Sequence, residues 1–135
     1  MKMINIACGK RIHEEWENID FSPQNPHTKR VNLLARMPYD DSSFDVAYSS
    51  HFLEHVDREV APKVLGEIRR ILKDEGIFRV VVPDLENMAR EYLHIIDSKE
   101  IEAYKHEWIT TEIFDQMVRM GGGGYVTNLP ARPGK

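Results

Sequence analysis

The first twenty residues constrain the fold most, because they place a glycine turn between two strand patterns. Residues 4–6 (Ile-Asn-Ile) have the character of a buried strand, and the small residues 7–9 (Ala-Cys-Gly) follow directly. Gly9 suits a tight turn, since glycine adopts positive φ at little steric cost and lets a ligand lie against bare backbone. Residues 18–21 (Asn-Ile-Asp-Phe) then predict a second short strand that ends near a carboxylate.

The Gly9 turn and Asp20 are expected at one edge of a sheet. In an open α/β sheet, ligands bind outside the carboxyl ends of the strands. A turn that carries the chain around a ligand, with a carboxylate that accepts both ribose hydroxyls, would hold a nucleoside. An ordinary strand with a turn and a capping Asp is the alternative. Because one glycine is no fingerprint, the pair alone leaves both interpretations open.

Composition bounds the class of protein. A chain of 135 residues with 41% hydrophobic and 30% charged residues fits one globular domain with a core. The net charge of −4 gives no support for a nucleic-acid partner. Cys8 is the single cysteine, so no internal disulfide can form and a reducing, cytoplasmic location is expected. The apolar runs are too short to cross a membrane.

Three further strands are predicted, over residues 31–34, 44–49 and 77–82. Residues 10–17 are charged and carry no helical stripe, so the connection between the first two strands is unusually short for parallel strands. Gly76 is expected to end the helical unit that precedes the strand over residues 77–82.

Helices are predicted over residues 58–73, from residue 85 to 96 and from 101 to 118. Pro62 is expected near the start of the first helix. The expected domain covers residues 1–120, and residues 121–135 have the Gly- and Pro-rich composition of a tail.

Four stretches carry a resemblance when they are taken in order: INIACG, WENIDFSP, VNLLARMPYDDSSFDVAYSSHFLEHV and EIRRILKDEGIFRVVVPDLENMAREY. Together they resemble the class I S-adenosylmethionine-dependent methyltransferases, most of all the small type 11-like group. The resemblance covers roughly residues 3–92. It implies an α/β, Rossmann-like methyltransferase fold, with a mostly parallel sheet of about five strands in the order 3-2-1-4-5 and C-terminal helices. It also implies S-adenosyl-L-methionine as cofactor.

The resemblance implies a cofactor site at the ends of four strands. The matching positions are Ala7, Cys8 and Gly9 against the methionine part of the cofactor, Asp20 at the ribose with Phe21 beside it, Asn32 and Leu33 at the adenine, and Ser49 and Ser50 near the sulfonium. Ala7 departs from the family's first glycine, and Asn32 from its usual Asp. An amide oxygen can still accept from the adenine amino group, but the amide adds a donor that must be satisfied. The predicted sheet also has fewer strands than the family's seven.

His51 is the predicted acid/base residue, because it follows the fourth strand and the histidine pKa ordinarily lies near neutrality. Glu54 and His55 match a Glu-His pair of the family, whose role we expect to be packing and orientation. Both histidines could equally be capping or core residues. A metal site is not predicted, because Glu54 would sit beside His55 rather than opposite it. No histidine lies in a motif that would activate Cys8 as a nucleophile.

The leading function is methyl transfer from S-adenosylmethionine to a small-molecule or glycan-like acceptor. The alternative is a degenerate, non-catalytic methyltransferase-like domain that binds the cofactor weakly or serves in assembly. A nicotinamide-dependent oxidoreductase is disfavoured, since there is no Gly-x-Gly-x-x-Gly and Asp20 follows Gly9 by 11 residues rather than about 20.

The last predicted strand would leave an open sheet edge. Residues 78–82 are apolar apart from Arg79, and nothing after them predicts a strong pairing partner. Edges of this kind promote association unless they are covered. We therefore expect either that the 98–120 helix covers the edge or that a homodimer forms through residues 77–82 and that helix.

Overall fold

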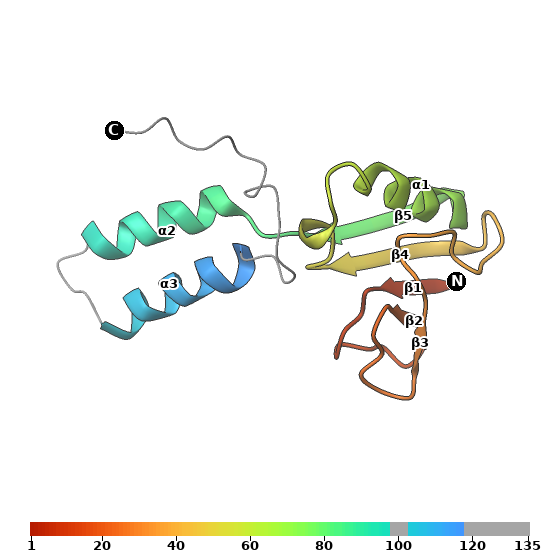
Figure 1. Cartoon of the computed structure of the whole chain (residues 1–135), viewed down its shortest axis with the longest axis horizontal. Helices are drawn as coiled ribbons and strands as arrows, with labels where there is room; N and C mark the ends of the chain where they lie inside the picture. Colours follow the sequence, from red (N-terminus) through yellow and green to blue (C-terminus); the bar gives the residue numbers. More distant parts are fainter. Residues whose placement is uncertain (98–102, 118–135) are drawn as a thin grey trace, which may run out of the picture. The chain divides into compact units, whose positions relative to one another are not determined.

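Residues 1–97 and 103–117 are described by the structure, a computed structural model, and the chain divides into two units. Met1–Val82 holds a sheet and helix α1 (Ala61–Ile71), whereas Pro83–Lys135 holds helices α2 (Leu85–Asp97) and α3 (Ala103–Met117) (Figure 1). The expected extent of the domain, residues 1–120, stays a prediction. The predicted tail over residues 121–135 lies outside the described residues.

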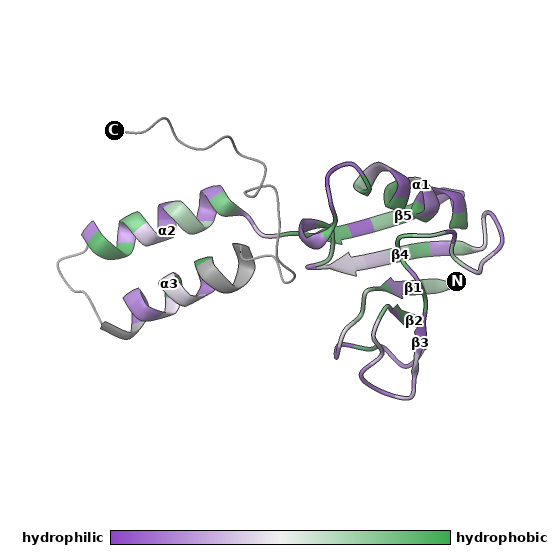
Figure 2. Cartoon of the chain, viewed as in Figure 1, coloured by the Kyte–Doolittle hydropathy of each residue, from purple (hydrophilic) through white to green (hydrophobic). Residues whose placement is uncertain are grey.

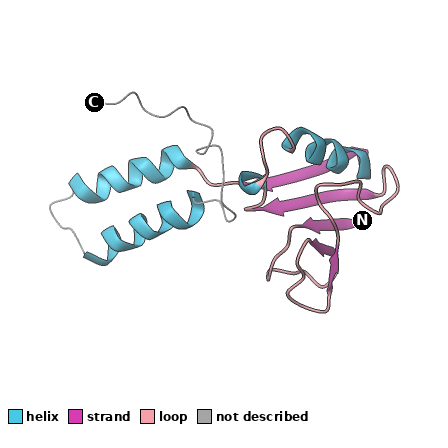
Figure 3. Ribbon diagram, in the orientation of Figure 1, coloured by secondary structure: helices cyan, strands magenta, loops and turns pink. Residues whose placement is uncertain are grey.

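Five parallel strands form the sheet of the first unit, in the order β3-β2-β1-β4-β5 (Figure 3). The strands are β1 (Met3–Ile6), β2 (Glu17–Asp20), β3 (Thr28–Arg30), β4 (Phe44–Ser50) and β5 (Leu72–Val81). This is the predicted fold class and strand order, so both are confirmed. The connection between β1 and β2 contains no helix, as its charged sequence predicted.

Helix α1 and one face of the sheet enclose the core. Ile4 pairs with Ala47 across β1 and β4, and side chains two apart on a strand share a face. α1 contributes Val64, Ile68 and Ile71 to the same cluster, each at most 1% exposed. Burial of an aliphatic side chain of this size stabilises the fold by about 1.5–3 kcal/mol. The apolar period of α1 therefore holds the helix against the sheet.

The ends of α1 differ from the prediction of residues 58–73. Pro62 lies in its first turn, where the missing N–H costs nothing. The helix ends at Ile71 because Leu72 takes extended backbone, with ψ 141°, and begins β5. Gly76 consequently lies inside the fifth strand instead of before it. Leu65, an apolar residue of this helix, is 41% exposed.

The third strand was predicted over residues 31–34, and this was wrong. β3 is Thr28–Arg30, and of its residues only Thr28 is buried. The apolar residues that suggested a strand, Val31 and Leu33, follow it in a loop whose side chains reach the core. Burial alone does not distinguish a strand from a loop whose side chains face the core. The apolar pattern therefore identified buried residues correctly but assigned them the wrong secondary structure.

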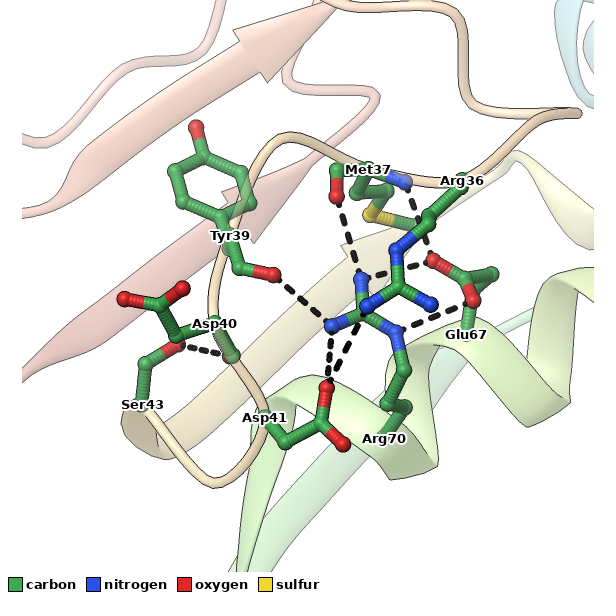
Figure 4. Close-up of polar contacts among 8 residues, drawn as sticks. All are labelled: Arg36, Met37, Tyr39, Asp40, Asp41, Ser43, Glu67 and Arg70. Carbon is green, nitrogen blue, oxygen red and sulfur yellow. Dashed lines mark hydrogen bonds and ion pairs between the residues drawn. The ribbon is translucent and has the colours of Figure 1, made fainter.

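A partly buried guanidinium, that of Arg70, holds the connection between β3 and β4 on α1 (Figure 4). Arg70 donates to the carbonyl oxygens of Met37 at 3.0 Å and Tyr39 at 2.7 Å, and to Asp41 Oδ1 at 2.7 Å. Glu67 accepts from the same guanidinium and from the Met37 backbone N–H. The hydrogen bond from Arg70 holds the pKa of Glu67 below its usual value. A guanidinium that is partly shielded from water needs such partners. The hydrogen bonds of Arg70 therefore also fix the path of the loop.

The second unit contains the helices α2 and α3, which contact each other and lie close to the predicted ranges. Ile95 of α2 and Ile109 of α3 are buried, and the rings of Tyr92 and His106 lie 5.8 Å apart. Apolar and polar residues alternate along α2 in Figure 2. Across the described ranges, no helix is both long and apolar enough to span a bilayer. The ends of the predicted 98–120 helix, residues 98–102 and 118–120, lie outside the described residues.

Candidate functional site

The turn after β1 adopts the left-handed backbone that its glycine suggested. Gly9 has φ 54°, and Ala7 has φ 57°. A left-handed conformation costs an alanine roughly 1–2 kcal/mol, so the surrounding structure must impose it. The backbone N–H of Cys8 donates to the Ile19 carbonyl at 3.1 Å, which ties the turn to β2. Ala7, which stands where the family resembled by this chain has its first glycine, therefore has a strained backbone.

The structure brings the Gly9 turn and Asp20 together. Gly9 N–H donates to Asp20 Oδ2 at 2.9 Å, and Ser22 N–H donates to Oδ1 at 2.8 Å. A carboxylate oxygen can accept two hydrogen bonds, so one acceptor position remains on each oxygen of Asp20. A Cβ added at Gly9 would meet no atom within 4 Å, so space is open in front of the turn. A carboxylate and bare backbone thus lie together beside open space at the carboxyl edge of the sheet.

The thiol of Cys8 does not face this opening. It is 7% exposed, and its sulfur lies 3.5 Å from Thr28 Oγ1. Burial raises the pKa of the Cys8 thiol, which disfavours the reactive thiolate. If Cys8 contacts the cofactor as predicted, it does so through its backbone and not through its thiol.

An apolar cavity of about 240 Å³ lies beside Phe21 and Leu33, two of the predicted cofactor residues. One further wall is His55, to which the sequence analysis gave a role in packing and orientation. The remaining walls, which it did not single out, are Leu34, Phe52, Val56, Asp57 and Val60. They come from the loop after β3 and from the segment around helix η1 (Leu53–His55). Apolar residues directly after strand ends are the signal that could have indicated them.

Asn32, predicted at the adenine, is exposed and does not line this cavity. Its Oδ1 accepts from the backbone N–H of Leu34 at 3.0 Å, which shapes the loop that carries Leu33. One acceptor position on the amide oxygen and its two N–H donors remain for other partners. Its predicted contact with a cofactor stays a prediction.

Strand β4 ends with Ser49 and Ser50, and His51 follows directly. This end lies next to the carboxyl end of β1, where Ser49 pairs with Ile6. Ser49 is 1% exposed, and its Oγ has no hydrogen-bond partner among the described residues. His51 adopts φ 53°, and its backbone N–H donates to the Val81 carbonyl at 2.9 Å. Strained backbone and unsatisfied polar atoms are frequent at functional sites.

Glu54 reaches back to His51 from η1. Its Oε1 lies 3.2 Å from His51 Nδ1 and 4.0 Å from His55 Nε2. The other oxygen, Oε2, is buried without a partner among the described residues. Glu54 therefore orients His51. The sequence analysis expected a role in packing and orientation for Glu54 but did not name His51 as its partner. Among the described side chains, no group of three or more His, Cys, Asp or Glu residues is arranged to hold a metal ion.

Comparisons with known proteins place the chain in a family. The family described as "Methyltransferase domain", of the type 11 group, matches residues 6–80, more than half of the chain. The uncharacterized protein MJ0638 of Methanocaldococcus jannaschii is 39% identical over 61 residues, which cover 45% of this chain and 25% of that protein. The chain thus matches about a quarter of that relative's length. Its fold, its strand order and the family match together assign the chain to the class I S-adenosylmethionine-dependent methyltransferases of the type 11 group.

Proposed function

We propose that this methyltransferase domain binds S-adenosylmethionine at the carboxyl edge of β1, β2 and β4 and transfers its methyl group to a small-molecule or glycan-like acceptor. The observation that carries the proposal is the hydrogen bond from Gly9 N–H to Asp20 Oδ2 at 2.9 Å, beside open space. It holds the two groups that a nucleoside needs within one site.

The residues present fit the cofactor at two places. The free acceptor positions on Asp20 suit two ribose hydroxyls, and each such charge-assisted bond contributes more than a neutral one. The apolar cavity beside Phe21 and Leu33 suits a flat base, since burial of apolar surface supports binding. His55 and Asp57 at its rim offer polar contacts to the edge of that base.

When bound, the cofactor supplies an already activated sulfonium methyl group. Catalysis then depends on proximity and alignment and, for a hydroxyl or amine acceptor, on removal of a proton. His51 is the proposed base. With Nδ1 held toward Glu54 Oε1 at 3.2 Å, its Nε2 is the nitrogen that remains for the acceptor. The acceptor class itself stays a proposal.

Label transfer tests the reaction. The chain is incubated with S-adenosylmethionine labelled on the methyl group and with pooled small metabolites and oligosaccharides. We expect transfer by the parent, its loss in His51→Ala, and unchanged affinity of that variant for S-adenosylhomocysteine. His13→Ala, at an exposed histidine of the β1–β2 loop, serves as the control and should transfer normally.

Two outcomes separate the alternatives. Cofactor binding without transfer to any acceptor would favour the non-catalytic domain. A variant at His51 that loses cofactor binding along with transfer would make His51 structural, contrary to the proposal.

A further inference from the structure

The face of the sheet opposite α1 carries a second concave surface. Side chains one apart on a strand point to opposite faces, so Asn5 and Tyr48 lie opposite the core residues Ile4 and Ala47. Tyr48 pairs in turn with Arg79 of β5. In the described part of Met1–Val82, this face meets the β1–β2 loop, residues 10–16, and no helix. The missing crossover helix leaves room on this side.

Two buried asparagines fix that loop on the sheet. Asn5 Nδ2 donates to the Arg11 carbonyl at 2.9 Å and to Asn18 Oδ1 at 3.1 Å. Asn18 Nδ2 donates to the carbonyls of His13 at 2.8 Å and Trp16 at 2.9 Å, and Oδ1 accepts from His13 N–H. Four of these five hydrogen bonds reach the loop and hold it in one path, and the fifth joins the two asparagines. The wall that it forms is ordered before any ligand arrives, which reduces the entropy cost of binding.

The loop and the sheet enclose an open cavity of about 540 Å³, within the usual size range of small-molecule sites. Its apolar surfaces come from Trp16, Tyr48 and Ile77, and Ile77 is 63% exposed. The rings of Trp16 and Tyr48 meet edge to face, with centroids 6.4 Å apart. Large aromatic surfaces of this kind favour a flat partner.

The charge of the cavity is positive in a chain whose net charge is −4. Arg11, His13 and Arg79 line it, and none of its lining residues is an Asp or Glu. Among the described residues, no carboxylate forms an ion pair with either guanidinium. The Arg79 guanidinium lies 6.0 Å from the centroid of the Tyr48 ring, so cation and aromatic surface are adjacent. Arg binds carboxylate and phosphate groups through two parallel hydrogen bonds.

We propose that this cavity binds a planar aromatic anion, a ring that stacks on Trp16 or Tyr48 and carries a carboxylate or phosphate toward Arg79 and Arg11. The lining residues come from the β1–β2 loop and from β1, β4 and β5, and they include neither the turn residues 7–9 nor any residue that lines the apolar cavity beside Phe21. The proposed site is therefore separate from the cofactor site and does not depend on methyl transfer.

Calorimetric titration tests the proposal with three probes of one ring system: 2-naphthoate, 2-naphthyl phosphate and the neutral 2-naphthamide. We expect saturable binding of at least one anion and at least tenfold weaker binding of the amide. The stronger anion identifies the carboxylate or the phosphate as the preferred group. In an isotopically labelled Trp108→Phe background, Trp16 is the remaining indole, and its N–H resonance should shift with the same affinity.

Arg79→Gln should weaken anion binding at least tenfold. Arg69→Gln removes the same charge from α1, on the other face of the sheet, and should leave the affinity unchanged. Each variant must first show the thermal midpoint of the parent. Trp16→Leu is a second variant, and it should weaken binding of the anions and binding of the amide by similar factors.

The proposal is overturned if neither anion binds below about millimolar concentration, if the amide binds equally well, or if Arg79→Gln binds like the parent. Competition by S-adenosylhomocysteine would place the probe in the cofactor site and would also overturn it. A second copy of the chain is the remaining possible occupant of this face. If neither anion binds and sedimentation shows a parent dimer that Trp16→Leu dissociates, a second copy covers the face and the proposal fails.

Discussion

Three of the four described residues with positive φ lie just after the carboxyl ends of β1 and β4, and the fourth, Ser42, lies in the turn before β4. Ala7, Gly9 and His51 all have φ between 53° and 57°. Alanine and histidine pay for this conformation with about 1–2 kcal/mol each, and such strain persists only where neighbouring contacts enforce it. At the residue scale, the candidate site is therefore built from positions that the rest of the fold holds in an unfavourable conformation.

Gly9→Ala should destabilise the chain by about 1–2 kcal/mol, because the added Cβ meets the left-handed penalty but no neighbouring atom. Gly66→Ala is the matched control. It lies inside α1, where its Cβ would also meet open space, and there alanine is expected to stabilise by about 0.5–1 kcal/mol. Urea unfolding measures both. Equal effects of the two substitutions would show that φ at Gly9 is not the controlling factor.

Asn18→Leu should destabilise the chain by about 2–4 kcal/mol, since it leaves the His13 and Trp16 carbonyls and the His13 N–H without their partner. Asn32→Leu removes a single bond at an exposed position and should cost less than about 1 kcal/mol. Denaturant unfolding of both variants checks the comparison. Similar losses would contradict the role given to Asn18.

At the scale of elements, burial decides what the sequence can predict. The strands around Ile6, Ala47 and Phe78 were located correctly because alternating apolar residues face α1. The third strand was misplaced because Val31 and Leu33 are buried from a loop, where periodicity carries no information on backbone.

Contacts between distant residues were harder to predict. The link between Gly9 and Asp20 was anticipated, because parallel strands end at a common edge. The hydrogen bonds of Asn5 and Asn18 depend on which strands are neighbours and on the path of a ten-residue connection. The same holds for Arg70, whose partners lie about thirty residues away along the chain. A local pattern does not encode such pairings.

Arg70→Met should destabilise the chain by about 2–4 kcal/mol at pH 7, because two carbonyls and two carboxylates lose a charged donor. The hydrogen bond from Arg70 lowers the pKa of Glu67 in the folded state. Glu67 therefore contributes full stability above its ordinary pKa of 4.5 and loses it as the pH falls through the lowered value.

The difference between parent and Arg70→Met should consequently narrow below about pH 4.5. Unfolding free energies measured from pH 7 to pH 3 test this. Arg69→Met is the control, since its exposed pair with Asp74 should contribute less than about 1 kcal/mol at any pH. A difference at Arg70 that does not depend on pH would contradict the assignment to Glu67.

At the scale of the whole molecule, β5 ends the sheet of the first unit, as the sequence predicted. Ile77 and Val80 on this strand are 63% and 42% exposed. The homodimer through residues 77–82 and the 98–120 helix stays a prediction. It follows from the unpaired backbone groups that an edge strand presents.

Sedimentation at micromolar concentration should show a dimer of the parent and a monomer of Val80→Lys, because a lysine on an edge opposes strand pairing. Leu65→Lys is the control: its side chain is 41% exposed on α1, away from the edge, and the variant should remain dimeric. A monomeric parent that still binds cofactor would contradict the dimer and favour the chain's own helix as the cover.

The central claim is that Asp20 and the turn at Gly9 hold an adenosyl cofactor. Calorimetric titration with S-adenosylhomocysteine, beside NAD, measures it most directly. We expect the parent to bind S-adenosylhomocysteine and not NAD. Asp20→Ala should weaken binding by about 1–3 kcal/mol, roughly fivefold to 150-fold, while Asp40→Ala, at an exposed carboxylate outside the site, should bind like the parent. Unchanged affinity in a folded Asp20→Ala variant would contradict the account.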